Sequence, residues 1–317
     1  MDRPPDIPVL VIFGSTACGK TALAERLFAD SGPFSGRVGI ISADSMQVYR
    51  GMDIGTAKPD PSLLRRLPHE LIDVRDVAER FSVADFVSLA DDSCARINAS
   101  GRVPLILGGT GFYIRNFLYG LPSTPPSDPE IRARLQDRLA REGPAALYRE
   151  LADKDPRRAS ELHPNDGYRI TRALEVYETA GTTFDSFALP ASFRPGYRFL
   201  VFVLTRERDD LYERIDRRID AMFAEGLADE VERLVSAGYG PSDPGMRAIG
   251  YREFFGETGL DRDLRAVRER ISRDTKRYAK RQETYVRSLP GVVCVGADAP
   301  GAVAWLAADF LRKAGGT

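Results

Sequence analysis

One short segment near the amino terminus constrains the fold of this chain more than any other. Residues 14–21 have the sequence GSTACGKT, which fits the pattern G-x-x-x-x-G-K-[ST]. An apolar run at 8–13 precedes this segment and an amphipathic helical pattern at 22–29 follows it, so the setting is strand, loop and helix. In such a setting the backbone N–H groups and the helix dipole bind phosphate oxygens. We call the segment the glycine loop and expect phosphate binding by all its residues: Gly14, Ser15, Thr16, Ala17, Cys18, Gly19, Lys20 and Thr21.

Two side chains of the glycine loop have predicted roles of their own. Lys20 supplies a full positive charge, and the Thr21 hydroxyl can bind Mg²⁺. The loop does not say which phosphates are bound, because kinases, ATPases and transferases share it.

Four further apolar runs predict the rest of a sheet. They occupy residues 38–42, 103–107, 199–204 and 292–295, and helical patterns separate them. Strands that alternate with helices form a parallel sheet with helices on both faces. The predicted fold class is therefore α/β, with a parallel sheet core like that of the P-loop NTPases.

The stretch from about residue 121 to 195 interrupts this alternation. It opens with the turn-forming sequence LPSTPPSDP and contains no obvious strand. We therefore predict a helical insertion at 123–195 and a catalytic core made of 1–122 and 196–317. The helical patterns of the insertion and of the later core lie at 130–141, 144–152, 168–179, 208–237 and 262–288.

Composition limits where the protein works and what it binds. The three cysteines are far apart and there are two histidines, so a zinc site or a disulfide framework is not expected and a reducing compartment fits. Residues 1–8 do not resemble a signal peptide, and no apolar run reaches the roughly 18 residues that span a membrane. We expect a cytoplasmic monomer. A net charge of -1 argues against a generic nucleic-acid binder but permits one basic face.

Asp44 lies just past the second apolar run, in ISADSMQVYRGMDIGTAKP. Since ligands bind at the carboxyl ends of parallel strands, Asp44 should lie near the glycine loop. Its carboxylate could bind Mg²⁺, accept a proton or simply cap a turn, and Asp53 has the same ambiguity. Lys58 could contact a phosphate or be a solvated charge. There is no apolar run ending in Asp of the Walker-B kind and no lid rich in arginine, which weakens the ATPase and kinase interpretations.

Motifs along nearly the whole chain resemble those of the tRNA dimethylallyltransferases, also called tRNA isopentenylpyrophosphate transferases. The absence of a carboxyl-terminal zinc finger resembles the bacterial members. Besides the glycine loop, the matching motifs are ADSMQVYRGMDIGTAKP (43–59), GGTGFYIRNFLYGL (108–121), DPEIRARL (128–135), HPNDGYRITRALEVYETAG (163–181), DEVERL (229–234), MRAIGYRE (246–253) and RDTKRYAKRQETY (273–285).

The resemblance implies the reaction. In this family the glycine loop holds the diphosphate of dimethylallyl diphosphate, and the N6 amine of the adenosine on the 3′ side of the tRNA anticodon attacks the allylic carbon. Lys20, the amides of residues 16–20 and Mg²⁺ bound through Thr21 would stabilise the leaving diphosphate. Arg218 matches a family arginine that reaches the diphosphate, and Asp44 matches the general base. The family commonly has Pro and Ser where Ser15 and Cys18 stand, and we hypothesise that Cys18 is oxidisable.

The resemblance also implies a tRNA-binding face for the anticodon stem-loop, with the insertion acting as a clamp. Thr110 could equally cap a helix and Arg132 could be an ordinary surface charge. Tyr49, Phe112 and Tyr113 are expected in the core or along a channel, and four basic residues of the last long helix share a face. The residues implied in tRNA contact are Asp44, Ser45, Met46, Gln47, Thr110, Arg132, Tyr168, Arg169, Ile170, Thr171, Arg172, Arg247, Ala248, Ile249, Gly250, Tyr251, Arg252, Arg273, Arg277, Lys280 and Arg281.

Three alternatives remain open at this point. A small-molecule P-loop kinase would bind ATP tightly and turn over without RNA. A transferase acting on free adenine nucleotides would have less need of the insertion and of the basic helix. An RNA-binding module with a vestigial loop would tolerate loss of Lys20.

Overall fold

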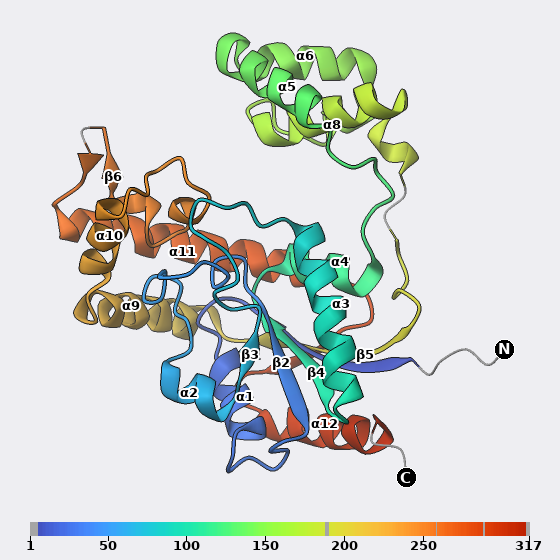
Figure 1. Ribbon diagram of the computed structural model, residues 1–317, viewed down its shortest axis with the longest axis vertical. Helices are drawn as coiled ribbons and strands as arrows, with labels where there is room; N and C mark the ends of the chain where they lie inside the picture. Colours follow the sequence, from blue (N-terminus) through green and yellow to red (C-terminus); the bar gives the residue numbers. More distant parts are fainter. Residues whose placement is uncertain (1–5, 188–189, 258, 288, 315–317) are drawn as a thin grey trace. The chain divides into compact units, whose positions relative to one another are not determined.

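The computed structural model describes residues 6–187, 190–257, 259–287 and 289–314 (Figure 1). Residues 1–5, which make up most of the segment judged not to be a signal peptide, lie outside the described part. The chain forms two compact units. The first, which we call the core unit, consists of Met1–Leu118 and Phe193–Thr317, and the second, the helical unit, is Tyr119–Ser192.

A six-stranded parallel sheet organises the core unit, in the order β3-β2-β4-β1-β5-β8. Every residue of β2 and β4 is buried, so helices cover both faces of the sheet. The predicted α/β class is confirmed, and the five predicted strands are all present. The strands are β1 (Ile7–Gly14), β2 (Val38–Ala43), β3 (His69–Glu70), β4 (Val103–Gly108), β5 (Tyr197–Thr205) and β8 (Val293–Gly296).

The central position of β1 places the candidate site. β1 pairs with β4 on one side and β5 on the other, with Phe13 opposite Gly108 and Gly14 opposite Leu204. Because all the strands run in parallel, their carboxyl ends meet at one edge of the sheet. The glycine loop, the turn that begins at Asp44 and the turn after β4 therefore share that edge.

Eight α-helices accompany the sheet in the described part of the chain. The predicted helical stretch at 208–237 is two helices rather than one, because Gly226 adopts a left-handed conformation with φ of 97°. The helices are α1 (Lys20–Phe28), α2 (Pro61–Arg66), α3 (Val83–Ala99), α4 (Gly111–Tyr119), α9 (Arg208–Ala224), α10 (Leu227–Ser236), α11 (Leu264–Arg287) and α12 (Pro300–Ala314).

Several short elements carry too few residues to show a period in the sequence, and none of them was predicted. β3 is one of them, and the antiparallel pair of β6 (Phe255–Gly256) and β7 (Gly259–Leu260) is another. The 3₁₀ turns are η1 (Phe184–Ser186), η2 (Gly245–Arg247) and η3 (Arg252–Phe254).

The helical unit has a small core of its own. Its buried side chains come from α5, α6, α7 and α8, and include Leu135, Leu147, Leu151, Ile170 and Leu174. Asp128 caps α5 and Asp155 caps α7, each with a proline at the start of the helix. No strand occurs in the described part of this unit. Its helices are α5 (Pro129–Glu142), α6 (Pro144–Lys154), α7 (Pro156–Ser160) and α8 (Gly167–Ala180).

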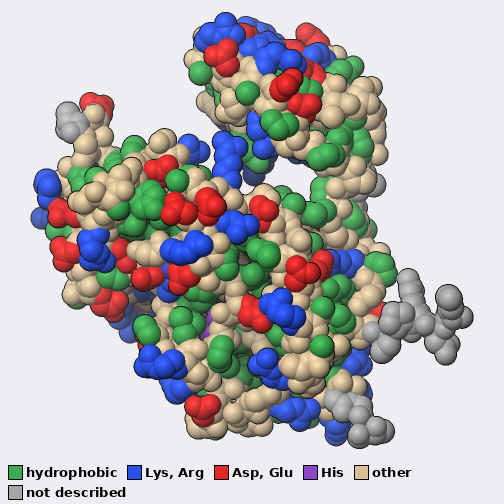
Figure 2. All heavy atoms as spheres, in the orientation of Figure 1, with side chains coloured by type: hydrophobic (Ala, Val, Ile, Leu, Met, Phe, Trp, Pro, Cys, Tyr) green, Lys and Arg blue, Asp and Glu red, His purple; other side chains and the backbone are tan. Residues whose placement is uncertain are grey.

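Charged side chains of both signs are interspersed over the face of the molecule in Figure 2, in keeping with the net charge of -1. None of the described helices combines the length and the apolar character needed to cross a bilayer.

Candidate active site

Close packing at the end of β1 requires a glycine at position 14, where the glycine loop begins. A Cβ on Gly14 would lie 2.7 Å from the Cys18 sulfur and 2.9 Å from the carbonyl oxygen of Leu204, so only glycine fits at the end of β1. Ala17 and Gly19 have positive φ values of 62° and 109°. Such conformations concentrate at functional sites, because the surrounding structure must hold them. α1 begins at Lys20, so its first N–H groups lack acceptors within the helix.

Two amides of the glycine loop already have protein partners. The Thr16 N–H donates to Gln282 Oε1 at 2.9 Å, and the Cys18 N–H donates to the Ser15 carbonyl at 3.3 Å. Lys20 Nζ donates to the carbonyls of Gly14 (2.9 Å) and Ser15 (2.8 Å). The Thr16 and Cys18 N–H groups are thus occupied, whereas the first N–H groups of α1 lack acceptors within the helix. Contact of all amides from 16 to 20 with the diphosphate stays a prediction.

Asp44 is fixed by the turn that it begins. Its Oδ1 accepts hydrogen bonds from the N–H groups of Met46 (2.9 Å) and Gln47 (3.4 Å). The Ser45 N–H donates to Thr110 Oγ1 at 3.0 Å, which ties this turn to the one after β4. Thr110 thus has a structural contact in addition to any contact with a ligand.

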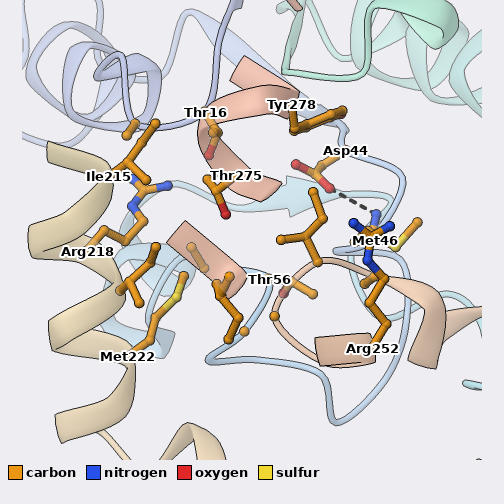
Figure 3. A pocket seen from close by; sticks show the side chains of 18 of the residues that line it. Thr16, Asp44, Met46, Thr56, Ile215, Arg218, Met222, Arg252, Thr275 and Tyr278 are labelled. Atoms are coloured by element: carbon orange, nitrogen blue, oxygen red, sulfur yellow. Dashed lines mark hydrogen bonds between the residues drawn. The ribbon is translucent and has the colours of Figure 1, made fainter. Parts of the chain in front are cut away.

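Two cavities open beside the glycine loop, and both are lined by Thr16, Asp44, Arg218 and Tyr278. The first, which we call the apolar cavity, has a volume of about 320 Å³. Figure 3 shows Thr16, Tyr278 and Asp44 along one side of this cavity and Met222 on the other. Its remaining apolar lining includes Ile215, Ile219, Ile249 and Ile271.

The second cavity, the polar cavity, has a volume of about 340 Å³. Lys20 and Thr21 line it from the glycine loop, Arg214 from α9 and Gln282 from α11. It therefore holds the groups that suit a phosphate, whereas the apolar cavity suits a hydrocarbon.

Arg218 projects from α9 into both cavities. Arg218 is exposed, yet desolvation by the surrounding protein lowers the pKa of its guanidinium, an effect partly offset by Cys18 and Asp44. Among the described residues Arg218 forms no ion pair, unlike Arg206, which pairs with Asp210 and Asp298. A crowded cation without a carboxylate partner is a place for an anionic ligand.

Tyr278 lies on α11 and lines both cavities together with Asp44. Burial raises the pKa of its hydroxyl to about 12, the Asp44 charge acts in the same direction, and hydrogen bonds with the side chains of Thr110 and Gln282 act against it. The hydroxyl is therefore neutral and serves as a hydrogen-bonding group.

The oxygen ligands available suit a magnesium ion. No group of three or more His, Cys, Asp or Glu side chains that could bind a metal occurs among the described residues. The Thr21 hydroxyl and the Asp44 carboxylate line the same polar cavity. Mg²⁺ commonly takes one or two protein oxygens and completes its shell with phosphate and water.

The predicted contact segment 247–252 divides into lining and core residues. The residues that line the apolar cavity are Arg247, Ala248, Ile249, Gly250 and Arg252. Tyr251, in contrast, is fully buried and donates a hydrogen bond to Glu230 at 2.7 Å. Its predicted role in tRNA contact is wrong for the side chain, because the hydroxyl holds α10.

The basic residues predicted to share a face on α11 are all exposed, namely Arg273, Arg277, Lys280 and Arg281. Asp274 lies among them and pairs with Arg252, Arg273 and Arg277. Burial would raise the pKa of Asp274, but the hydrogen bonds from Arg252 and Arg273 lower it overall.

The helical unit contains the other predicted tRNA contacts. Tyr168 is 71% exposed, and Arg169 is exposed beside Asp166. Arg132 and Arg172 both pair with the buried Glu175. Ile170 and Thr171, however, are buried in the packing of α8, so a contact through their side chains is wrong.

Three single-residue expectations are also corrected. Cys18 is fully buried against Gly14, which argues against an oxidisable thiol. Phe112 is 57% exposed, which excludes the core but leaves its place along a channel a prediction, while Tyr49 and Tyr113 are buried as expected. Lys58 forms ion pairs with Asp53 (2.7 Å) and Asp73 (2.5 Å), so it braces its own loop and is not a phosphate ligand.

Sequence reasoning missed several residues of the two cavities. Thr275, Tyr278 and Gln282 lie on α11 within the motif RDTKRYAKRQETY, at spacings of three and four. That spacing puts them on one helix face, and it was a usable signal. Arg214, one turn before Arg218, was equally visible; its Nε donates to the Ala17 carbonyl at 2.9 Å.

Comparison with known proteins gives consistent matches. The family model described as IPP transferase matches residues 47–289. A tRNA dimethylallyltransferase of Geobacter sulfurreducens is 44% identical over 285 residues, which are 90% of this chain and 90% of the relative. One of Symbiobacterium thermophilum is 46% identical over 283 residues, 89% of this chain and 86% of the relative.

A solved structure agrees with these relatives. The full-length tRNA isopentenylpyrophosphate transferase of Bacillus halodurans is 35% identical with a TM-score of 0.68, and the match covers 98% of each chain. This chain therefore aligns with tRNA dimethylallyltransferases and a tRNA isopentenylpyrophosphate transferase over almost its whole length. The aligned length includes the motifs, the sheet and the residues that line the two cavities.

Proposed function

The chain belongs to the IPP transferase family, and on that premise we propose that it transfers a dimethylallyl group from dimethylallyl diphosphate to tRNA. The acceptor is the N6 amine of the adenosine on the 3′ side of the anticodon, and diphosphate is released. The kinase and the free-nucleotide alternatives are not favoured, because the relatives are named tRNA dimethylallyltransferases.

One observation supports this function above the others: Asp44, Arg218 and the glycine loop line the same two cavities. A leaving diphosphate needs positive charge and N–H groups, whereas an attacking amine needs a base. Residues that meet both requirements line the same two cavities.

The reaction follows from this arrangement. The adenine N6 forms a bond to the allylic carbon while the carbon–oxygen bond breaks and its electron pair passes to the diphosphate. Lys20, Arg218 and the N–H groups at the start of α1 stabilise the growing negative charge. Asp44, held by the amides of Met46 and Gln47, accepts the proton that N6 loses.

The hydrocarbon group has its own place. Ile215, Ile219, Met222, Ile249 and Ile271 line the apolar cavity, and they would surround the dimethylallyl chain. By excluding water from the allylic carbon, these side chains would prevent hydrolysis of a cation-like transition state.

We propose Mg²⁺ as the cofactor, and the Thr21 hydroxyl, which lines the polar cavity, would hold it. When bound, it would supply further positive charge to the leaving group. Asp44 lies in the same cavity, but its role here is that of the base.

We propose that the partner is the anticodon stem-loop. Its phosphates would meet the exposed basic residues of α11, and its target base would leave the stack to reach Asp44. We also propose that the protein is a monomer and works in the cytoplasm. Light scattering of the purified protein tests the monomer, and a mass of two chains would contradict it.

The direct test is incubation of the protein with labelled dimethylallyl diphosphate, Mg²⁺ and unmodified tRNA, followed by nucleoside analysis. We expect prenylated adenosine at the position after the anticodon. Label transfer to AMP but not to tRNA, or turnover of ATP without RNA, would overturn the proposal.

A further inference from the structure

Gln282 is a buried polar residue to which the reaction above assigns no role. It lies on α11, one turn after Tyr278, and is 5% exposed. Both ends of its amide are in use: Oε1 accepts from the Thr16 N–H at 2.9 Å, and Nε2 donates to the Gly109 carbonyl at 2.5 Å. One side chain therefore links α11 to the glycine loop and to the turn after β4.

The structure around Gly109 is shaped to receive this amide. A Cβ on Gly109 would lie 2.7 Å from Gln282 Nε2, so any other residue would push the amide away. The next residue, Thr110, accepts the Ser45 N–H and so connects the same turn to Asp44. A displacement of Gln282 would therefore shift both the glycine loop and the turn that begins at Asp44.

α11 also carries the basic face. Lys280 and Arg281 immediately precede Gln282, and Arg273 and Arg277 lie one to three turns before it. All four are exposed, with the Arg277 side chain 66% accessible. A continuous helix of 24 residues with a hydrogen-bonded backbone transmits a shift at its outer face to its inner face.

We propose that Gln282 is a positioning residue that couples RNA binding on α11 to diphosphate binding at the glycine loop. This inference rests on the proposed function. RNA phosphates fix α11, α11 fixes Gln282, and Gln282 holds Thr16 where the loop binds diphosphate best. Coupling of this kind is reciprocal, so bound diphosphate raises the affinity for RNA by the same factor.

The test measures the ratio of two dissociation constants for pyrophosphate, one without RNA and one with RNA. Calorimetry gives the Kd of inorganic pyrophosphate, with Mg²⁺, in the absence and in the presence of saturating anticodon stem-loop RNA. In the wild-type protein we expect the RNA to lower this Kd by about fivefold or more, within the range usual for coupled sites. In Gln282→Met, which keeps the length of the side chain but lacks the amide, the ratio should fall to near one.

Ser272→Ala is the matched control. Ser272 is also on α11, but it donates its hydrogen bond to Asp216 of α9 at 2.6 Å, and neither residue lines either cavity. This variant should keep the wild-type ratio. A purely structural role for Gln282 would lower stability and both affinities but leave the ratio unchanged, and that result would overturn the inference.

The wild-type protein separates failure of this inference from failure of the proposed function. If RNA and pyrophosphate each bind but the ratio is one, the function stands and the coupling is wrong. If the RNA does not bind at all, both are wrong. Should Gln282→Met fail to fold, hydrogen exchange on the wild-type protein decides: the stem-loop alone should slow exchange in the glycine loop, and unchanged exchange would refute the coupling.

Discussion

Arg218 and Asp44 line the same two cavities from different elements, one from α9 and the other from the turn after β2. They form no ion pair with each other, although crowding lowers the pKa of Arg218 and the Asp44 charge partly offsets this. Opposite charges that face one space without pairing suit two substrates that meet there, one with an anionic leaving group and the other with an N–H to be deprotonated.

Replacement of Asp44 by Asn should abolish most turnover. Loss of a general base typically costs about 10²- to 10⁴-fold in rate, while the amide keeps the shape of the turn. Single-turnover transfer of labelled dimethylallyl to tRNA measures this. Asp53→Asn is the control, since Asp53 pairs with Lys58 and lines neither cavity; equal losses in the two variants would remove Asp44 as the base.

Replacement of Arg218 by Met should weaken binding of pyrophosphate. A hydrogen bond to a charged group contributes about 1.5–3 kcal/mol, which corresponds to roughly 10- to 100-fold in Kd. Its neighbour Arg217 is exposed and pairs with Glu213, so Arg217→Met should change the Kd by about twofold at most. Calorimetry with Mg²⁺ and pyrophosphate gives the Kd of both variants. If the two substitutions weaken binding equally, pyrophosphate binds at the protein surface and not in the cavity beside Arg218.

Charge reversal at Arg277 and Lys280 should raise the KM for tRNA and flatten its dependence on salt. Abolishing the interaction with one RNA phosphate lowers the slope of log affinity against log salt by about one unit. Arg262→Glu with Arg265→Glu is the control, because both arginines are exposed and the charge change is the same. If the control variant shows the same shift, the effect comes from net charge and not from this face of α11.

Alkylation should distinguish the three cysteines of the native protein. Cys294 is exposed, whereas Cys18 and Cys94 are buried, and burial also raises the pKa of the Cys94 thiol. Iodoacetamide followed by mass spectrometry should therefore modify Cys294 alone, and the others after unfolding. Rapid native modification of Cys18 would restore the idea of an oxidisable thiol in the glycine loop.

The sequence predicts those parts of the fold that have a strong local signal. Every residue of β2 and β4 is buried, and such strands appear as continuous apolar runs. β3 has two residues and no such run, so its edge position depends on pairing with β2. Likewise, GSTACGKT predicts an anion site from its own residues, whereas Gln282 meets Thr16 across 266 positions of the chain. Ile170 and Tyr251 lie within family motifs, yet their side chains are buried in the core. A motif alone does not say which of its side chains point into the core.

Acidification should destabilise the protein through His69. Burial lowers the pKa of this imidazole, partly opposed by its hydrogen bond with the Leu67 carbonyl. The folded state therefore keeps His69 neutral while the unfolded chain takes up a proton near the ordinary value of about 6.5. Stability rises with pH wherever the unfolded state binds more protons, so it is intact above that value and falls as the pH drops below it.

The measurement is the Tm between pH 7.5 and pH 5.5. Carboxylates with lowered pKa lose their contribution only nearer pH 4, and His163→Gln is the control for the other histidine, which is exposed. The Tm of the wild-type protein and of His163→Gln should fall across the window, and that of His69→Gln should change little. An equal fall in all three proteins would show that another group titrates on unfolding.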